Sequence, residues 1–446
     1  MCPESTRRDF LKIGGLAGLG LFTARGGTVS AAPPRRAAKA KSVVLIFNCG
    51  GPSHIDLWDP KPQAPDTVRG PFRPIPTNVA GLQVSELLPR LARRADKLAV
   101  IRSVHHKQSS HNAAMYWAIV GQPYRVDSTL INPSRSDLPS LGTLVGWLSQ
   151  RGGYRGSLPP YVFTPAPHCD STQYITPGQF GGVMGPAQDP YVLNADPNAA
   201  DFKVSDMSLV EGMTADRLIE RRALLQRFES VTRLAEIPAA REIGLYQAKA
   251  IAMVTAPEVK RTFDLTREPA EVRARYGRNS WGQSHLLARR LVEAGVPFVT
   301  TVNGPSITWD THKDNFTQMK DRLVPPMEQA FVALLDDLSD RGLLDSTIVL
   351  WMGDFGRTPQ INKDAGRDHW PQCFSAVLAG GGLRVGQVIG ESDATGSYPA
   401  SYAVEPADIH ATVLTQLGYD PSGTTYLSSD GRPLPLSYGK PIRALL

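Results

Sequence analysis

The sequence predicts an α/β fold with a mostly parallel central sheet and helices on both of its faces. Short runs rich in β-branched residues alternate with longer helical stretches along most of the 446 residues. This is the order expected when crossover helices join parallel strands. The runs are apolar almost throughout, as in strands that are buried on both faces. The length is sufficient for a large core with insertions.

The elements follow from these patterns in chain order. The predicted strands are 42–47, 98–104, 161–164, 297–302, 346–352 and 374–378. The predicted helices are 138–150, 207–255, 281–294, 317–341 and 406–417, with another opening at His111. The stretches 165–200 and 207–255 interrupt the alternation, so we expect them to be insertions that cover or wall a cleft.

The first 41 residues differ from the rest. Arg7-Arg8 followed by Phe10-Leu11-Lys12 predicts a twin-arginine signal peptide over residues 1–31. Residues 32–41 are expected to be a disordered linker before a domain at 42–446. We therefore expect a periplasmic or otherwise exported protein, whose partner during export is the twin-arginine translocase. No segment is long and apolar enough to predict a stable membrane span.

Charge and cysteine content exclude some functions. Residues 1–41 carry the whole net charge of +6, so the remainder is near neutral and predicts no nucleic-acid partner. The chain has no G-x-G-x-x-G motif and no paired cysteines, which argues against a redox enzyme. Cys49, Cys169 and Cys373 are expected to be buried free thiols, with a Cys169–Cys373 disulfide left open.

Polar residues cluster just after the predicted strands, where open α/β sheets bind their ligands. Seven of the nine histidines lie at or near such positions, at 54, 105, 106, 111, 312, 369 and 410. Carboxylates beside imidazoles suit zinc or manganese, whereas an oxygen-lined site would suit calcium or magnesium. The predicted metal ligands are Asp310, His312, Asp354 and His369. Possible substrate contacts or supports for these ligands are Asn48, Ser53, His54, Asp56 and Asp368.

Three further residues are candidates for catalysis. Arg357 either clamps a phosphate or sulfate through its planar fork or pairs with Asp354 or Asp364 to hold its loop. His111 and Asn112 open a helix, and a helix N-terminus suits an anion or a nucleophile. The alternative is that this helix simply packs into the core.

Several blocks in order resemble an exported bacterial family, the "domain of unknown function 1501" family, placed in the alkaline phosphatase superfamily beside sulfatases. The blocks are Asn48–Pro62, His111–Tyr116, Trp309–His312, Gly353–Pro359 and Gly366–Pro371. The resemblance covers about residues 42–440. It implies an alkaline phosphatase-like fold.

The resemblance also implies roles for single positions. The acidic residue that superfamily enzymes carry after the first strand corresponds to Asn48 or Cys49, and their hydroxyl or modified-cysteine nucleophile corresponds to His111. Their metal-binding pairs correspond to Asp310 with His312 and to Asp354, and their last metal histidine to His369. His111 would then form a phosphohistidine-type intermediate, or metal-bound water would attack, or no hydrolysis would occur.

Two functions follow from these observations. The first is an exported metal-dependent hydrolase of phosphate or sulfate esters, acting on a small-molecule or glycan ester. The second is a catalytically degenerate protein of the same fold that binds a metal or an anionic glycan. Retained Asp, His and Arg residues favour the first, and the missing hydroxyl nucleophile favours the second.

Overall fold

The computed structural model describes residues 37–170, 174–204, 212–231, 247–248, 250–304, 306–428 and 430–446. The predicted signal peptide and the start of the predicted linker lie outside these residues. The end of that linker is ordered, contrary to our expectation. The main-chain N–H groups of Lys39 and Ala40 both donate to Gln416 O at 3.1 Å, and Ala40 is buried.

The centre is an eight-stranded sheet in the order β12-β4-β11-β8-β1-β7-β5-β6. β11 is antiparallel to β4 and β8, and the other neighbouring pairs are parallel. All six predicted strands are present, so the fold class is confirmed. The strands are β1 Ser42–Asn48, β4 Leu98–Val104, β5 Tyr161–Thr164, β6 Tyr191–Val192, β7 Phe298–Val302, β8 Thr347–Gly353, β11 Phe374–Gly380 and β12 Gln387–Ile389.

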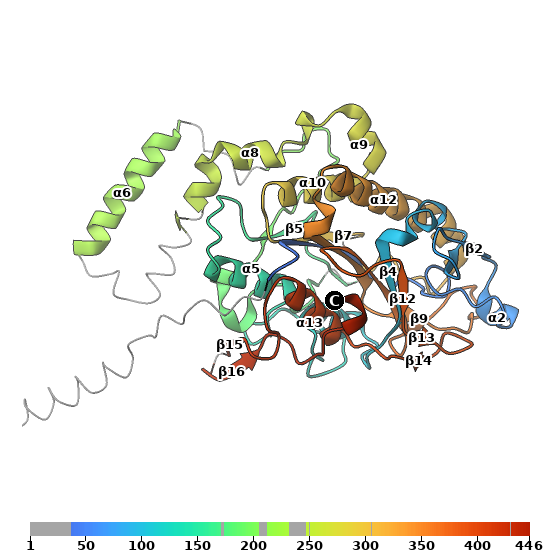
Figure 1. Cartoon of the computed structure of the whole chain (residues 1–446). Helices are drawn as coiled ribbons and strands as arrows, with labels where there is room; N and C mark the ends of the chain where they lie inside the picture. The colour runs from blue at the N-terminus through green and yellow to red at the C-terminus, as the bar shows by residue number, and fades with distance from the viewer. Residues whose placement is uncertain are drawn as a thin grey trace, which may run out of the picture. The chain divides into compact units, whose positions relative to one another are not determined.

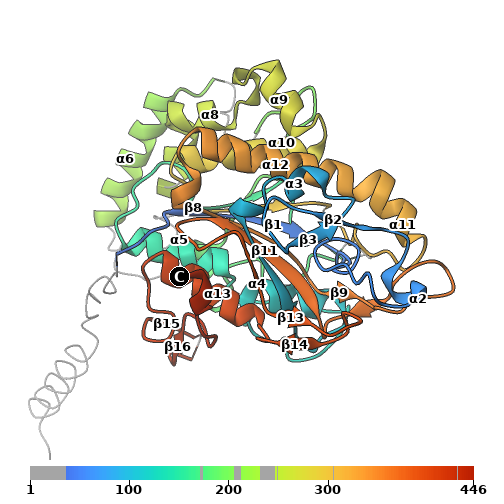
Figure 2. The same cartoon turned by 45° about the vertical axis from the view of Figure 1, so that its right-hand side comes forward.

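Helices cover both faces of this sheet because its strands are apolar on both sides. On β1, Val44 and Ile46 join one buried cluster, while Val43, Leu45 and Phe47 join the other. Helices α10 and α12 lie over the first face, and α4, α5 and α13 over the second (Figures 1 and 2). Their bounds are α4 His111–Val120, α5 Leu141–Arg151, α10 Ser280–Glu293, α12 Val324–Asp340 and α13 Pro406–Gln416.

The predicted helix 317–341 is broken into three parts. A short α11 at Asn315–Thr317 leads into a π-helical turn at Gln318–Leu323, and α12 follows. Pro325 and Pro326 fall in the first turn of α12. There the missing N–H of a proline removes no hydrogen bond, because first-turn N–H groups have no partner within the helix. Smaller helices and strands include α2 Asp66–Arg69, β2 Pro74–Pro76, β3 Gln83–Ser85, α3 Pro89–Ala92, α8 Pro257–Phe263 and α9 Ala270–Tyr276.

The two predicted insertions have different structures. Stretch 165–200 contributes β6, which pairs in parallel with β5, so it extends the sheet as well as forming loops. Within 207–255 the described part includes α6 at Ala215–Val231. None of the described helices has the length and apolarity needed to cross a membrane.

Candidate metal centre

Five of the predicted site residues meet at the carboxyl edge of the parallel strands. His111 opens α4 after β4, Asp310 and His312 follow β7, and Asp354 follows β8. His369 comes from the short strand β10 His369–Trp370, which pairs with β9 Gly356–Arg357. The edge that the sequence predicted is therefore the edge where these side chains gather.

The carboxylate of Asp310 lies at the centre of this cluster. Its Oδ1 is 3.1 Å from His312 Nε2 and 3.2 Å from His369 Nε2, and its Oδ2 is 3.4 Å from His111 Nε2. The two Nε2 atoms of His312 and His369 are only 3.0 Å apart. One ligand atom from each of His111, Asp310 and His369 lies within 4.8 Å of the other two.

The outer nitrogen of each imidazole fixes its tautomer. Nδ1 of His111 is 2.5 Å from Asp354 Oδ2, and Nδ1 of His312 is 2.6 Å from Asp368 Oδ1. Nδ1 of His369 is 2.6 Å from the main-chain oxygen of Ser109. Ionised carboxylates and carbonyl oxygens only accept hydrogen bonds, so each Nδ1 carries the proton when the ring is neutral.

The Nε2 atoms of His312 and His369 therefore face each other, and all three Nε2 atoms face the Asp310 carboxylate. When all three rings are neutral, Arg357, which contacts Asp310, is the only hydrogen-bond donor among these groups, and buried His111 Nε2 has no hydrogen-bond partner. Such an arrangement requires a positive charge among these atoms, either a second proton on a ring or a bound cation. Ligand atoms 2.0–2.1 Å from a tetrahedral zinc ion would stand about 3.3 Å apart, which is close to the observed separations. The residues thus fit a divalent metal ion.

The electrostatics of the cluster favour positive charge. Burial alone would raise the pKa of Asp310, but its contacts with the His111 and His369 rings and the charge of Arg357 hold that pKa well below its usual range. Burial opposes charge on His111, yet nearby Asp354 and Asp310 raise its pKa. The pKa of His369 is lowered, chiefly by burial. The carboxylates thus stabilise a cation at the inner end of the cluster.

Close backbone approaches bring the supporting loops together. Gly50 has φ +106°, and a Cβ there would lie 2.6 Å from the main-chain nitrogen of Asp310. A Cβ on Gly366 would lie 1.9 Å from the main-chain oxygen of His312. Only glycine permits both contacts, which explains why glycines flank the polar residues in these two blocks.

Arg357 holds loops and does not present its fork to an anion. Its side chain is fully buried, and Nε donates to Gly51 O at 2.8 Å. Nη1 donates to Arg367 O at 3.1 Å, and Nη2 reaches Asp310 Oδ1 at 2.6 Å as well as Gly50 O and Trp309 O. The anion-clamp alternative is therefore not supported, because these donors are already used by the protein.

Asp354 stands behind the cluster. One of its oxygens accepts from His111 Nδ1 and the other from the main chain of Gly50 at 3.1 Å. Asp368 supports His312 in the same way, although its side chain is 52% exposed. Carboxylates in these positions orient metal-binding imidazoles and raise their basicity. We predicted Asp354 as a metal ligand, but in the structure it contacts His111 Nδ1 and so supports a ligand instead.

The remaining predicted residues are structural. Asn112 directs its amide away from the cluster, to Thr129 O at 2.7 Å and Ile131 O at 3.1 Å. Asp56 forms a fully buried pair with Arg367 at 2.8 Å. Asn48, Ser53 and His54 are also buried, and their printed partners are Ile46 O, Met352 O and Asn303 for Asn48, Asp56 N for Ser53, and Gly396 O for His54.

The supporting contact that the sequence did not reveal is the one between His369 Nδ1 and the main-chain oxygen of Ser109. A main-chain carbonyl carries no residue-type signal, so the acceptor for His369 could not be read from the sequence. Cys49, Cys169 and Cys373 are all free thiols, as expected, but Cys169 is only half-buried.

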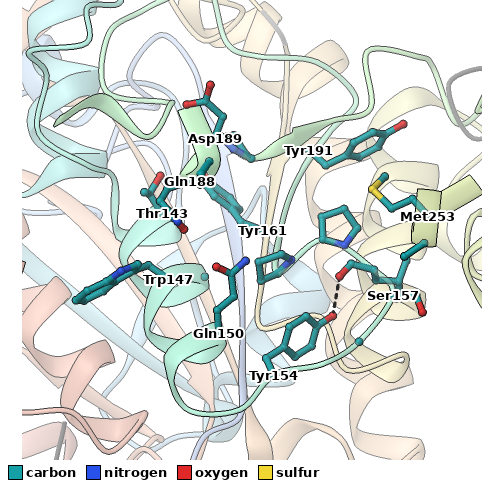
Figure 3. A pocket seen from close by; sticks show the side chains of 18 of the residues that line it. Thr143, Trp147, Gln150, Tyr154, Ser157, Tyr161, Gln188, Asp189, Tyr191 and Met253 are labelled. Carbon is teal, nitrogen blue, oxygen red and sulfur yellow. Dashed lines mark hydrogen bonds between the residues drawn. The ribbon is translucent and has the colours of Figure 1, made fainter. Parts of the chain in front are cut away.

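An aromatic pocket lies at the opposite edge of the sheet. It has a volume of about 660 Å³ and is bounded by α5, by the residues just before β5 and β6, and by Met253 (Figure 3). Its walls are mainly aromatic rings and prolines, including Trp147, Tyr154, Pro159, Pro160, Tyr161 and Tyr191. Among the residues that line it there is no histidine, cysteine or glutamate, and Asp189 is the one carboxylate.

The family assignment follows from the whole chain. Residues 40–446 match the family described as "Protein of unknown function (DUF1501)". The protein belongs to this family. No curated protein matches its sequence at a significant level.

Solved structures with a similar arrangement include members of the alkaline phosphatase superfamily. A superfamily protein from Vibrio parahaemolyticus is 10% identical, with a TM-score of 0.40 over 87% of this chain and 69% of that chain. The PsFucS1 sulfatase from Pseudoalteromonas sp. is 13% identical, with a TM-score of 0.36 over 93% and 72%. A phosphonate monoester hydrolase from Silicibacter pomeroyi is 12% identical, with a TM-score of 0.37 over 90% and 76%. These scores are low, so the chemistry of this chain must be argued from its own residues.

Proposed function

We propose that this protein is an exported, metal-dependent hydrolase of phosphate or sulfate esters. The observation that carries the proposal is the convergence of three imidazole Nε2 atoms on the Asp310 carboxylate. His111, His369 and Asp310 would hold the ion, with His312 on the exposed side. Three nitrogens and one oxygen favour zinc, with manganese as the next choice.

A divalent ion bound there would act as a Lewis acid on an ester oxygen and would lower the pKa of water. The residues of the chain prepare that site. Asp354 and Asp368 hold protons on Nδ1 of His111 and His312 and so keep the Nε2 lone pairs available. Arg357 fixes Asp310 through a buried hydrogen bond.

The site is open to solvent on one side only. The side chain of His111 is 4% exposed, whereas those of His312 and His369 are 41% and 23% exposed. A substrate would therefore approach from the side of His312 and Asp368. The proposal takes the substrate to be an ester of a small molecule or a glycan.

A specific observation favours the second candidate, a metal-binding protein without hydrolysis. The hydroxyl of Ser109, next to the start of α4, donates to Asp127 at 3.0 Å and not to the cluster. No described hydroxyl is shown in contact with Asp310 or the three imidazoles, so a serine nucleophile has no support.

The experiment measures metal and activity together. The mature protein is purified, its metal content is determined, and it is assayed with aryl phosphates and aryl sulfates before and after chelation. Activity that is lost with the chelator and restored by zinc supports the hydrolase. Bound metal without activity on either class supports the binding protein, and a wild-type protein that binds neither Zn²⁺ nor Mn²⁺ rejects both.

Export is tested separately. Replacing Arg7 and Arg8 by lysines should retain the protein in the cytoplasm, because twin-arginine export reads this pair. Cell fractionation measures the distribution, and unchanged periplasmic protein would contradict the proposal.

A further inference from the structure

A segment of the loop between α4 and α5 is fastened along the start of α4. We call residues 124–131 the strap. Gln108 holds the beginning of the strap from both sides of its amide: Nε2 donates to Tyr124 O at 2.8 Å, and Oε1 accepts from Tyr124 N at 3.0 Å. Asn112 holds the end of the strap through Thr129 and Ile131.

Asp127 fastens the middle of the strap. Its Oδ2 accepts from Ser109 N at 2.9 Å and from Ser109 Oγ at 3.0 Å, and its Oδ1 accepts from Ser110 N at 2.8 Å. One carboxylate thus takes three hydrogen bonds from two consecutive residues. Ser109 lies before α4, so these contacts do more than cap the helix.

The same Ser109 is the support of His369. Its main-chain oxygen accepts from His369 Nδ1 at 2.6 Å. His111 and His312 rest on carboxylates, whereas His369 rests on a peptide oxygen whose position depends on its own loop. A charged residue that fixes this peptide can therefore control one imidazole of the cluster.

We infer that Asp127 is a positioning residue for the metal centre, acting through the peptide of Ser109 on the imidazole of His369. The inference rests on the proposed metal site and extends it to a residue that lies outside the cluster. Asp127 contacts none of the four proposed ligands directly, so its effect must pass through Ser109.

The test uses the mature protein with Asp127→Ala, and Co²⁺ as the probe for both affinity and absorption spectrum. Loss of such outer supports typically weakens metal binding by about 10–100-fold. Asp127→Asn keeps one acceptor oxygen and is expected to recover part of the affinity. Asp264→Ala is the matched control, because Asp264 makes a similar turn contact with Thr266 N and Oγ1.

A second readout separates positioning from a merely structural role. In the metal-free protein with ¹⁵N-labelled histidine, Asp127→Ala should shift the ring signals of His369 more than those of His111 and His312, which contact it. The melting temperature of metal-free Asp127→Ala should remain close to that of the Asp264→Ala control.

The outcomes are distinct. Wild-type protein that binds Co²⁺ together with an Asp127→Ala variant of equal affinity overturns the positioning role and leaves the metal site standing. A weakened variant in which all three ring signals move alike, with a matching loss of melting temperature, also overturns it. Wild-type protein that binds neither Co²⁺ nor Zn²⁺ overturns the metal site and the positioning role together.

Discussion

The two edges of the central sheet differ in chemistry. At the amino edge, α5 and the residues before β5 and β6 enclose a pocket of about 660 Å³ with aromatic and proline walls (Figure 3). At the carboxyl edge, a small cluster brings His111, Asp310 and His369 within ligand distance of one another. The pocket at the amino edge lacks converging histidines and carboxylates, whereas the cluster at the carboxyl edge has them.

The largest expected effect is loss of the metal from the carboxyl edge. Asp310→Ala removes the carboxylate on which all three Nε2 atoms converge, so metal content after dialysis should fall from stoichiometric to near zero. His369→Ala should act in the same direction. Atomic emission spectroscopy of the purified proteins measures this. Unchanged metal in both variants would mean that the ion, if any, lies elsewhere.

The buried pair Asp56–Arg367 should dominate the stability of the same edge. Arg367→Met leaves the Asp56 carboxylate buried without its partner, which typically costs about 3–5 kcal/mol of unfolding free energy. The exposed pair Asp66–Arg69 is the control, since Arg69→Ala should cost no more than about 1 kcal/mol. Urea denaturation of the metal-free proteins compares the two, and equal losses would refute the argument.

The supporting carboxylates should differ in strength. Asp354→Asn should weaken metal binding by about 10–100-fold, which is about 1.4–2.7 kcal/mol. Asp368→Asn should weaken it less, because Asp368 is largely solvated while Asp354 is fully buried. Competition titration with a chromophoric chelator ranks the variants. The reverse order would show that burial does not set the strength of these supports.

The buried histidines His111 and His285 should change the stability of the metal-free protein in opposite directions as the pH falls. His111 has its pKa raised, in part by Asp354, whereas burial lowers the pKa of His285 to about 4. In the unfolded chain His285 takes up its proton near pH 6.5, so stability is lost as the pH falls from about 6.5 towards 4. The slope from one such group is at most about 1.4 kcal/mol per pH unit.

This slope is measured on the metal-free protein by denaturation at several pH values. His285→Gln should flatten it, because the substituted side chain does not titrate. An unchanged slope in this variant would show that other groups account for the acid sensitivity.

The smallest effect is expected at the amino edge. Trp147→Ala alters the wall of the aromatic pocket, and the affinity for Zn²⁺ should stay within about twofold because sites without shared contacts act independently. A larger loss of Zn²⁺ affinity, measured by calorimetric titration, would show that the two edges of the sheet are energetically coupled.

Strands and site residues were predictable to different degrees. Continuous apolar runs revealed β1, β4, β5, β7, β8 and β11, because strands buried on both faces leave that signature. The two-residue β6 and the three-residue β12 are too short for any period to show. The break before α12 was missed as well, because its two buried residues, Met319 and Leu323, are four apart and so fit the period of an uninterrupted α-helix.

The sequence alone determined the fold class and the edge of the sheet that carries the polar residues. It grouped Asp310, His312, Asp354 and His369 as metal ligands and placed His111 at the same edge as a catalytic residue. It did so because residues that follow parallel strands must meet at one edge, whatever the loops do. Only the tertiary structure decided the contact that each side chain makes. It turned Arg357 and Asn112 towards the backbone, set Asp354 behind His111, and made Asp127 and the Ser109 peptide part of the support. Those contacts depend on distances between loops far apart in the chain, which residue types and spacing do not specify.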